Sequence, residues 1–157
     1  MDNLDLKILE GLRVDARRPF LELAKELGVS DATIHMRVKR MVKEGVIQGF
    51  ATIVDHRKLG YGVTAFIEVR VKPGTADEAV SKLSGIKGVL ETHEMHGRYD
   101  ILLKVKVKDL DELRDKVVND IRRLEEVVSS EAHTVLKVVK EMHSMPIPIQ
   151  GVGIAGV

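Results

Sequence analysis

Residues 20–45 read FLELAKELGVSDATIHMRVKRMVKEG, and this stretch decides the fold of the first part of the chain. Its apolar residues recur at helical spacing on both sides of Gly28, which predicts two helices joined by a tight turn. Glycine suits the end of the first helix because it takes positive φ readily. Ser30 suits the start of the second, since its hydroxyl can accept a free backbone N–H. The small Ala24 lets the two helices approach closely, as is typical of a helix-turn-helix.

A further helix precedes this pair, and the last of the three carries a basic face. The preceding helix is predicted from one apolar face of Leu4, Ile8, Leu9 and Leu12. At 100° per residue, the buried side of the last helix comprises Ile34, Val38, Met41 and Val42. Between Arg37 and Lys43 there are four cations and no acid, so a formal net charge of only +1 does not exclude DNA binding.

We predict that this last helix enters the major groove of DNA. Residues near the start of such a helix contact base edges, whereas phosphate contacts position the protein without specifying sequence. The base-edge candidates are Thr33, Met36, Arg37 and Arg40, and the phosphate candidates are Ser30, Lys39 and Lys43. The alternative is that the basic face is only solvated, but the surrounding helix-turn-helix pattern favours DNA.

Beyond residue 46 the apolar pattern alternates with the two-residue period of strands. Residues 46–55 contain two candidate strand segments around Gly49, and residues 59–62 form a linker. The predicted elements that follow are a strand at 63–71, a turn at Pro73-Gly74, a helix opened by a Thr75–Glu78 capping box, a strand at 89–95, a turn at Gly97, a strand at 101–107, a helix opened by Asp109 and Glu112, and a strand at 127–139. The order β-α-β-β-α-β is that of a ferredoxin-like domain.

The chain is therefore predicted to be an α+β protein of two domains. Residues 1–60 form the helix-turn-helix domain, with the motif itself at about 20–43, and residues 61–141 form the ferredoxin-like domain. The remaining residues, 142–157, are apolar but interrupted by Pro146, Pro148 and three glycines. We expect this tail to be mobile or to pack on another subunit.

Composition excludes several classes of protein. The 157 residues are 44% apolar, too rich for a disordered chain, and contain no apolar run of 18 residues that would cross a membrane. No signal segment opens the chain, and the absence of cysteine excludes disulfide frameworks and cysteine-based metal centres. We therefore expect a cytoplasmic protein.

The sequence predicts no metal site and no catalytic residues. Six histidines are present, but none stands in a His-x-His or His-Glu-x-x-His spacing. His93 and His96 are three apart on a predicted strand, so they point to opposite faces. Because no nucleophile motif or phosphate-binding loop occurs either, we predict that the protein is not an enzyme and needs no cofactor.

An ordered set of residues carries a resemblance to a known family. In the first 60 residues the set comprises Asp5, Ile8-Leu9, Asp15-Ala16-Arg17, Glu22-Leu23-Ala24, Gly28, Ser30, Arg37-Val38, Arg40, Gly45-Val46-Ile47, Gly49-Phe50, Asp55 and Leu59-Gly60. With them the chain resembles the Lrp/AsnC family, the leucine-responsive and asparagine-synthetase regulators. The later stretch GRYDILLKV looks like that family's glycine-x-x-aspartate turn, here Gly97 to Asp100. The resemblance covers residues 2 to about 141.

The resemblance implies a winged or plain helix-turn-helix followed by a ferredoxin-like domain that oligomerises and binds small effectors, usually amino acids. Dimers would assemble into octamers or other rings, with the effector between dimers beside the glycine turn. The implied effector-binding residues are Glu94, Met95, His96, Gly97, Arg98, Tyr99, Asp100, Arg114, Ser130, Ala132 and Thr134.

The chemistry of the turn agrees with an amino-acid effector. Backbone N–H groups at a glycine turn suit an α-carboxylate, and the Asp100 carboxylate could pair with an α-ammonium. Asp100 could instead only cap the turn, and its polar neighbours could only be solvated. Many family members carry threonines on the last strand, where this chain has Ser130 and Ala132, and that departure bears on the identity of the effector.

The sequence thus predicts a sequence-specific transcriptional regulator that binds double-stranded DNA and is modulated by an amino acid. One alternative is an architectural DNA-binding protein that needs no effector. The other is an enzyme like the siroheme decarboxylases, which share this architecture. In that case His93, His96, Arg98 and Arg114 would surround a tetrapyrrole carboxylate.

Overall fold

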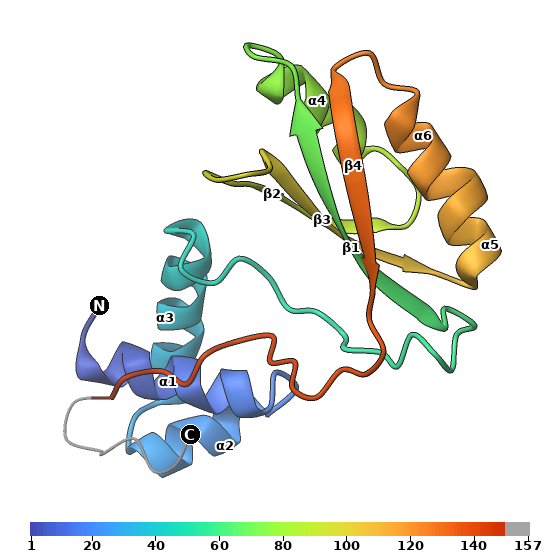
Figure 1. The fold of residues 1–157 in the computed structure, drawn as a ribbon. Helices are drawn as coiled ribbons and strands as arrows, with labels where there is room; N and C mark the ends of the chain where they lie inside the picture. Colours follow the sequence, from blue (N-terminus) through green and yellow to red (C-terminus); the bar gives the residue numbers. More distant parts are fainter. Residues whose placement is uncertain (150–157) are drawn as a thin grey trace. The chain divides into compact units, whose positions relative to one another are not determined.

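The computed structural model describes residues 1–149, so the predictions for the end of the tail, residues 150–157, lie outside the described residues. The chain divides into two compact units. Unit 1 comprises residues 1–53 together with the segment that begins at Lys140, and unit 2 comprises residues 54–139 (Figure 1). No helix of the described residues is long and apolar enough to cross a membrane.

Unit 1 is built from three helices, as predicted: α1 (Asn3–Val14), α2 (Phe20–Leu27) and α3 (Asp31–Lys43). Gly28 ends α2 in the left-handed conformation with φ of 68°, and the Ser30 hydroxyl caps α3 by accepting the Thr33 N–H. The helices enclose one apolar core, made of Ile8, Leu12, Leu23, Ala24, Ile34, Val38 and Met41. Local capping and apolar periodicity together therefore specify this helix-turn-helix.

Two local predictions in unit 1 are wrong. Val42 was expected on the buried side of α3 but is 48% exposed. No strand forms in residues 46–55, although the composition suited one. A strand needs a neighbouring strand to pair its backbone groups, and within the described residues no strand pairs with this segment. Its large apolar side chains, such as Phe50 and Ile53, are exposed.

Unit 2 has the predicted β-α-β-β-α-β order. Its strands are β1 (Val63–Val71), β2 (Val89–Glu94), β3 (Ile101–Val107) and β4 (Val127–Thr134). They form one antiparallel sheet in the order β2-β3-β1-β4. Helix α4 (Ala76–Ser84) follows β1, and a second helical segment, Leu110–Arg122, follows β3.

Alternating side chains give the sheet two different faces. Odd-numbered residues of β1 and β3 are buried against α4 and the second helical segment, and they form the core of the unit (Figure 1). Even-numbered residues, including Phe66, Glu68 and Leu102, lie on the opposite side and are half-buried, apart from Arg70, which is exposed. We call this second side the open face of the sheet.

Three elements of unit 2 differ from the prediction. Thr75 precedes α4 but makes no capping bond, because its hydroxyl donates to the Lys72 carbonyl instead. The second helical segment is α5 (Leu110–Glu112), a π-helical turn η1 (Leu113–Val118) and α6 (Asn119–Arg122), rather than one regular helix. β4 ends at Thr134 instead of residue 139, five residues short. Thr134 pairs with Ala65, and β1 extends only to Val63 beyond that pair, so residues 137–139 have no partner on β1.

The described part of the tail packs on its own chain, although the sequence suggested a mobile segment or another subunit. The Ile147 N–H donates to Glu10 Oε2 on α1 at 3.1 Å. Ile149 lines a hollow of about 440 Å³ with residues of α1 and α2. The prolines at 146 and 148 cannot donate backbone hydrogen bonds, which disfavours a helix or a sheet strand in this segment.

Candidate nucleic-acid interface and effector site

The outer face of α3 is the candidate nucleic-acid interface. Its inner face is fixed in the core by Ile34, Val38 and Met41, all at most 7% exposed. On the outer face Met36 is 66% exposed, and Lys39 and Lys43 are also exposed. Packing on one side of α3 therefore presents an apolar side chain and two cations to solvent on the other.

The two arginines of α3 bind to α1. Arg37 Nη1 donates to Asp2 Oδ2 at 2.6 Å and to Asp5 Oδ1 at 2.9 Å, and Arg40 Nη2 donates to Asp5 Oδ2 at 2.6 Å. Arg37 is the more enclosed, with 22% of its side chain exposed against 46% for Arg40. The sequence predicted that both would read bases. In the structure without DNA both guanidinium groups hold α3 against α1, and base reading stays a prediction.

Asp5 is the buried centre of this network. Its side chain is 1% exposed, and Asp2 and Asp5 also form a reciprocal capping box at the start of α1. The hydrogen bond from Arg37 lowers the pKa of Asp2 to about 2. Burial opposes ionisation of Asp5, but the Asp2 N–H and the two arginines outweigh it and lower its pKa. Both acids are therefore ionised at neutral pH, and the network is a charged one.

The structure thus separates the seven predicted DNA-binding residues into two groups. Arg37 and Arg40 pair with Asp2 and Asp5, and the other five do not. Ser30 and Thr33 lie at the start of α3, where their hydroxyls bond to each other at 2.8 Å. Among residues 1–149, Lys39 and Lys43 form no ion pair, so their charge is available to phosphate. The arginine pairs went unnoticed in the sequence, although a signal existed: acids and arginines both stand three residues apart, at 2 and 5 and at 37 and 40.

The predicted effector turn joins β2 to β3. The Met95 N–H donates to the Asp100 carbonyl at 2.8 Å, and the Asp100 N–H donates to the Val69 carbonyl at 3.0 Å. The Asp100 carboxylate accepts the Val71 N–H through Oδ2 at 2.8 Å, so it ties the turn to β1. Gly97 is exposed, and a Cβ there would meet nothing within 4 Å. The backbone beside Gly97 is therefore open to a ligand.

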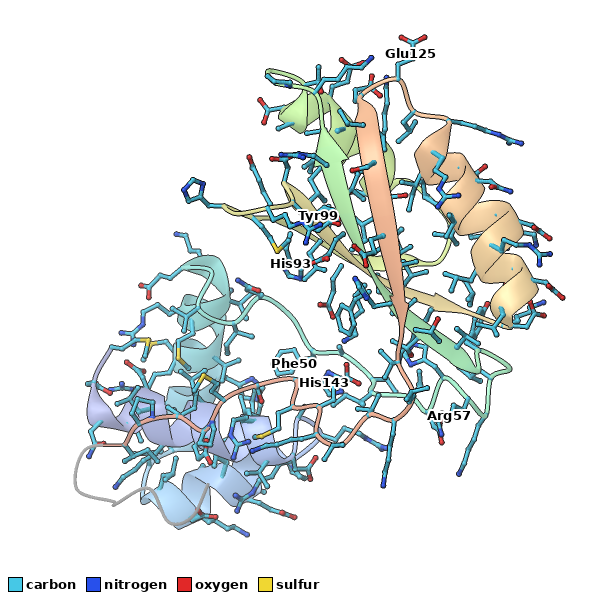
Figure 2. The ribbon with its side chains drawn as sticks, in the orientation of Figure 1. Phe50, Arg57, His93, Tyr99, Glu125 and His143 are labelled. Carbon is cyan, nitrogen blue, oxygen red and sulfur yellow. The ribbon has the colours of Figure 1, made fainter. Side chains whose placement is uncertain are left out.

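Tyr99 connects this turn to β4 (Figure 2). Its hydroxyl donates to Glu131 Oε2 at 2.7 Å, and the Arg98 guanidinium lies over its ring, 5.5 Å from the centroid. The same hydrogen bond lowers the pKa of Glu131. Ser130 is near the same end of the sheet, since it and Ile101 both pair with Val69.

Other predicted effector residues lie elsewhere. Thr134 pairs with Ala65, four residues along β4 from Ser130 and therefore roughly 13 Å away. Arg114 is on η1, where it pairs with Asp111 at 3.2 Å and Asp115 at 2.6 Å. His93, named for the tetrapyrrole alternative, is on β2 and bonds to Glu91. Within one chain, Ser130 therefore lies at the same end of the sheet as the 95–100 turn, whereas Arg114 and Thr134 lie elsewhere.

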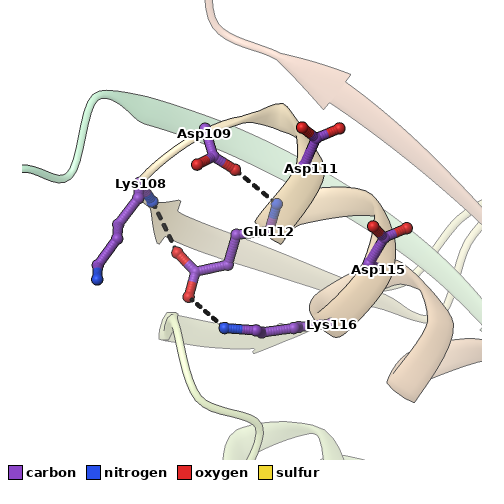
Figure 3. Close-up of a pocket in the computed structure, with 6 residues that line it drawn as sticks. All are labelled: Lys108, Asp109, Asp111, Glu112, Asp115 and Lys116. Carbon is purple, nitrogen blue, oxygen red and sulfur yellow. Dashed lines mark hydrogen bonds and ion pairs between the residues drawn. The ribbon is translucent and has the colours of Figure 1, made fainter.

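A hollow of about 260 Å³ lies at the start of the second helical segment (Figure 3). Four of its lining residues are acids: Asp109, Asp111, Glu112 and Asp115. Asp109 caps the helix by accepting the Glu112 N–H at 2.7 Å, as the sequence predicted. Glu112 accepts the Lys108 N–H at 2.9 Å and pairs with Lys116 at 3.3 Å. These bonds complete a helix start, and the acidic lining does not suit an α-carboxylate.

Two family models match the chain. Residues 1–42 match the AsnC-type helix-turn-helix domain, and residues 64–145 match the Lrp/AsnC ligand binding domain. Together they cover both units.

Named relatives agree with these matches. The HTH-type transcriptional regulator FL11 of Pyrococcus furiosus is 36% identical over 147 residues, which is 94% of this chain and 97% of that protein. The regulatory protein AsnC of Haemophilus influenzae is 40% identical over 132 residues, 83% of this chain and 88% of that protein.

Solved structures share the fold. Escherichia coli AsnC is 37% identical with a TM-score of 0.84, covering 90% of this chain and 95% of that one. The regulator NMB0573 of Neisseria meningitidis, solved as a complex with L-Met, has a TM-score of 0.86 at 24% identity, covering 93% and 96%. The second likeness concerns the fold alone.

Proposed function

Because the chain belongs to the Lrp/AsnC family of transcriptional regulators, we propose that α3 docks in the major groove and that an amino acid bound at the 95–100 turn modulates DNA binding. The observation that carries the first part is the outer face of α3, where Lys39, Lys43 and Met36 are exposed while Arg37 and Arg40 hold the helix in place. In this proposal the lysines neutralise phosphates, and Met36 and Thr33 touch base edges such as the thymine methyl group.

A single α3 covers only one half-site, so we propose that the working form is a dimer. Two copies of α3 would reach half-sites about one helical turn of DNA apart. The scattered effector residues also favour assembly, since a second copy placed beside the turn could supply the groups that one chain leaves distant. Dimers would associate further into an octamer or another ring. The partner being DNA, the protein would work in the compartment that holds the genome.

The 95–100 turn supports an amino-acid effector through its chemistry. Open backbone at Gly97 suits a carboxylate, and Asp100 keeps one oxygen, Oδ1, for an ammonium group while Oδ2 holds Val71. The complex of NMB0573 with L-Met gives one example of such a ligand on this fold. An effector acts only as far as it prefers one assembly or DNA-bound state over another.

The experiment separates the charge of Asp100 from its structural bond. Asp100→Asn keeps an oxygen for the Val71 N–H and removes the negative charge, whereas Asp100→Ala removes both. Calorimetric titration with each amino acid should show binding to the natural protein and none to Asp100→Asn at unchanged thermal stability. Asp100→Ala should in addition lose about 1–3 kcal/mol of stability.

Three outcomes contradict parts of the proposal. Undiminished binding by Asp100→Asn would show that the turn does not hold the ammonium group. No binding of any amino acid by the natural protein would leave an effector-independent DNA-binding protein and make Ala132 the first position to restore to threonine. Failure to bind duplex DNA of any sequence would contradict the proposal that the protein is a DNA-binding regulator.

A further inference from the structure

Three metal-ligating side chains meet on the open face of the sheet. Glu68 is on β1, and Glu131 and His133 are on β4. His133 Nε2 lies 3.3 Å from Glu68 Oε2 and 3.9 Å from Glu131 Oε1, and one ligand atom from each residue lies within 4.8 Å of the others. Residues two apart on a strand share a face, so Glu131 and His133 lie on the same side of β4.

The strand register places two negative charges opposite each other. Glu68 pairs directly with Glu131 across β1 and β4. Like charges at directly opposed positions destabilise a sheet, and His133 is the nearby group that lies between their side chains. A cation between the two carboxylates would remove that repulsion.

We propose that Glu68, Glu131 and His133 bind a divalent transition-metal ion of the Zn²⁺ class. Bonds of about 2.0–2.2 Å at tetrahedral angles place ligand atoms roughly 3.4 Å apart, close to the distances around His133. Small rotations of exposed side chains bring Glu131 into the same geometry. Three protein ligands leave a fourth position for water or for a group of another molecule.

Tyr99 acts as the outer support of this site. Its hydroxyl donates to Glu131 Oε2 and leaves Oε1, the oxygen nearer to His133, to face the metal. Ligating carboxylates are commonly held by such an outer hydrogen bond, and its loss weakens metal binding. The imidazole nitrogen selects a transition metal, because Mg²⁺ and Ca²⁺ prefer a full set of oxygen ligands.

The test is titration of the full-length, metal-stripped protein with Zn²⁺ by calorimetry and with Co²⁺ by visible absorption. We expect one Zn²⁺ per chain, a d–d absorption band with Co²⁺, and a melting temperature that rises with Zn²⁺. His133→Ala should weaken binding at least about tenfold and remove the rise in melting temperature. Glu131→Gln and Glu68→Gln should weaken it as well, and Tyr99→Phe by about tenfold.

The matched control is His93→Ala. His93 also lies on a strand beside a glutamate, with its Nε2 at 3.2 Å from Glu91 Oε2, but within residues 1–149 no third ligand joins that pair. Its loss should leave the affinity for Zn²⁺ unchanged. The proposal is overturned if the natural protein binds no Zn²⁺, if His133→Ala binds as well as the natural protein, or if His93→Ala loses binding equally. The first of these would mean that the His133 imidazole lies between the two glutamates without a metal ion.

Discussion

In the part of the chain that the structure describes, each unit contains one buried acid, and the two acids are used differently. Asp5 in unit 1 is 0% exposed, and Glu126 in unit 2 is 6% exposed. Both oxygens of Asp5 have partners, namely Arg37 on one side and Arg40 with the Asp2 N–H on the other. Glu126 has Lys82 at 2.6 Å on Oε1, but Oε2 has no hydrogen-bond partner among the described residues.

The difference concerns what each acid holds in place. Asp5 joins α1 to α3, so its pairs set the orientation of the helix that we expect to meet DNA. Glu126 lies just before β4 and pairs with α4, at the margin of a sheet whose core is entirely apolar. A fully satisfied network therefore supports the functional helix of unit 1, whereas unit 2 depends mainly on apolar packing.

The largest effect is expected from Asp5→Ala. Breaking a buried ion pair costs about 3–5 kcal/mol, and because both arginines reach solvent we expect the low end, about 3 kcal/mol, for α1 and α3. Glu126→Ala should cost about 1 kcal/mol, since it also removes an unsatisfied oxygen and Lys82 keeps Glu78 at 2.7 Å. Hydrogen exchange of α1 and α3 against β1 and β3 measures the two losses separately.

The comparison of the two acids would fail if the two losses of stability came in the reverse order. If Glu126→Ala loosened unit 2 more than Asp5→Ala loosened unit 1, the missing partner of Oε2 would have to come from outside the described residues. Asp31→Ala is the control for unit 1, because the Asp31 side chain is 44% exposed and, among the described residues, pairs only with His35 at 3.6 Å. It should cost less than about 1 kcal/mol.

A smaller loss of stability is expected when the pH is lowered, because a protonated carboxyl group keeps part of its hydrogen bonding. The pKa of Asp2 is about 2 in the folded chain against an ordinary 3.8. A lowered pKa contributes stability that is complete above about pH 4 and is lost as the pH falls through 2. Arg37→Ala removes the cause, so its melting temperature should lie below that of the natural protein at pH 7.

Thermal melts followed by circular dichroism across the pH range check this linkage. The gap in melting temperature between the natural protein and Arg37→Ala should narrow from about pH 4 and close near pH 2. Carboxylates elsewhere, such as Glu10 with a pKa of about 2, titrate in both proteins and cancel in the difference. A gap independent of pH would mean that Arg37 stabilises unit 1 through its aliphatic stem instead of its charge.

The same network marks the limit of what the sequence could predict. Helix ends at Gly28, Ser30 and Asp109 follow from neighbouring residues, and so the order of elements was predictable. The pairing of Arg37 with Asp5 joins residues 32 positions apart and depends on how α1 crosses α3. Periodicity identified α3 as cationic but could not show which cations were already paired.

Unit 2 shows the same limit at its turn. The resemblance identified Gly97 to Asp100, and the structure confirms a turn between two strands there. It could not show that Oδ2 of Asp100 bonds to Val71, because that contact requires the register of β1 against β3. The strand expected at 46–55 failed for a related reason, since alternation predicts a strand but does not supply its partner.

The smallest effect on stability is expected from Lys39→Ala. This variant tests whether the cations of α3 divide into those paired with acids and those that contact DNA. Lys39 is exposed on the outer face, so its loss should not change the stability of unit 1. If it contacts a phosphate, the slope of log K against log salt should become shallower by about 1, equally for every DNA sequence. Fluorescence anisotropy with a labelled duplex, at salt from about 50 to about 200 mM, measures that slope.

Two variants decide whether the division is correct. Lys25→Ala removes an exposed lysine from α2, outside the proposed interface, and should leave the slope unchanged. Arg40→Ala should lower the stability of unit 1, because Asp5 loses one of its two arginines. Arg40→Ala could instead leave stability intact and relax the preference for one DNA sequence. That result would mean that Arg40 moves away from Asp5 when DNA binds and that Arg40 itself contacts a base. The bond to Asp5 would then be the resting position of a DNA-reading arginine rather than part of the framework of unit 1.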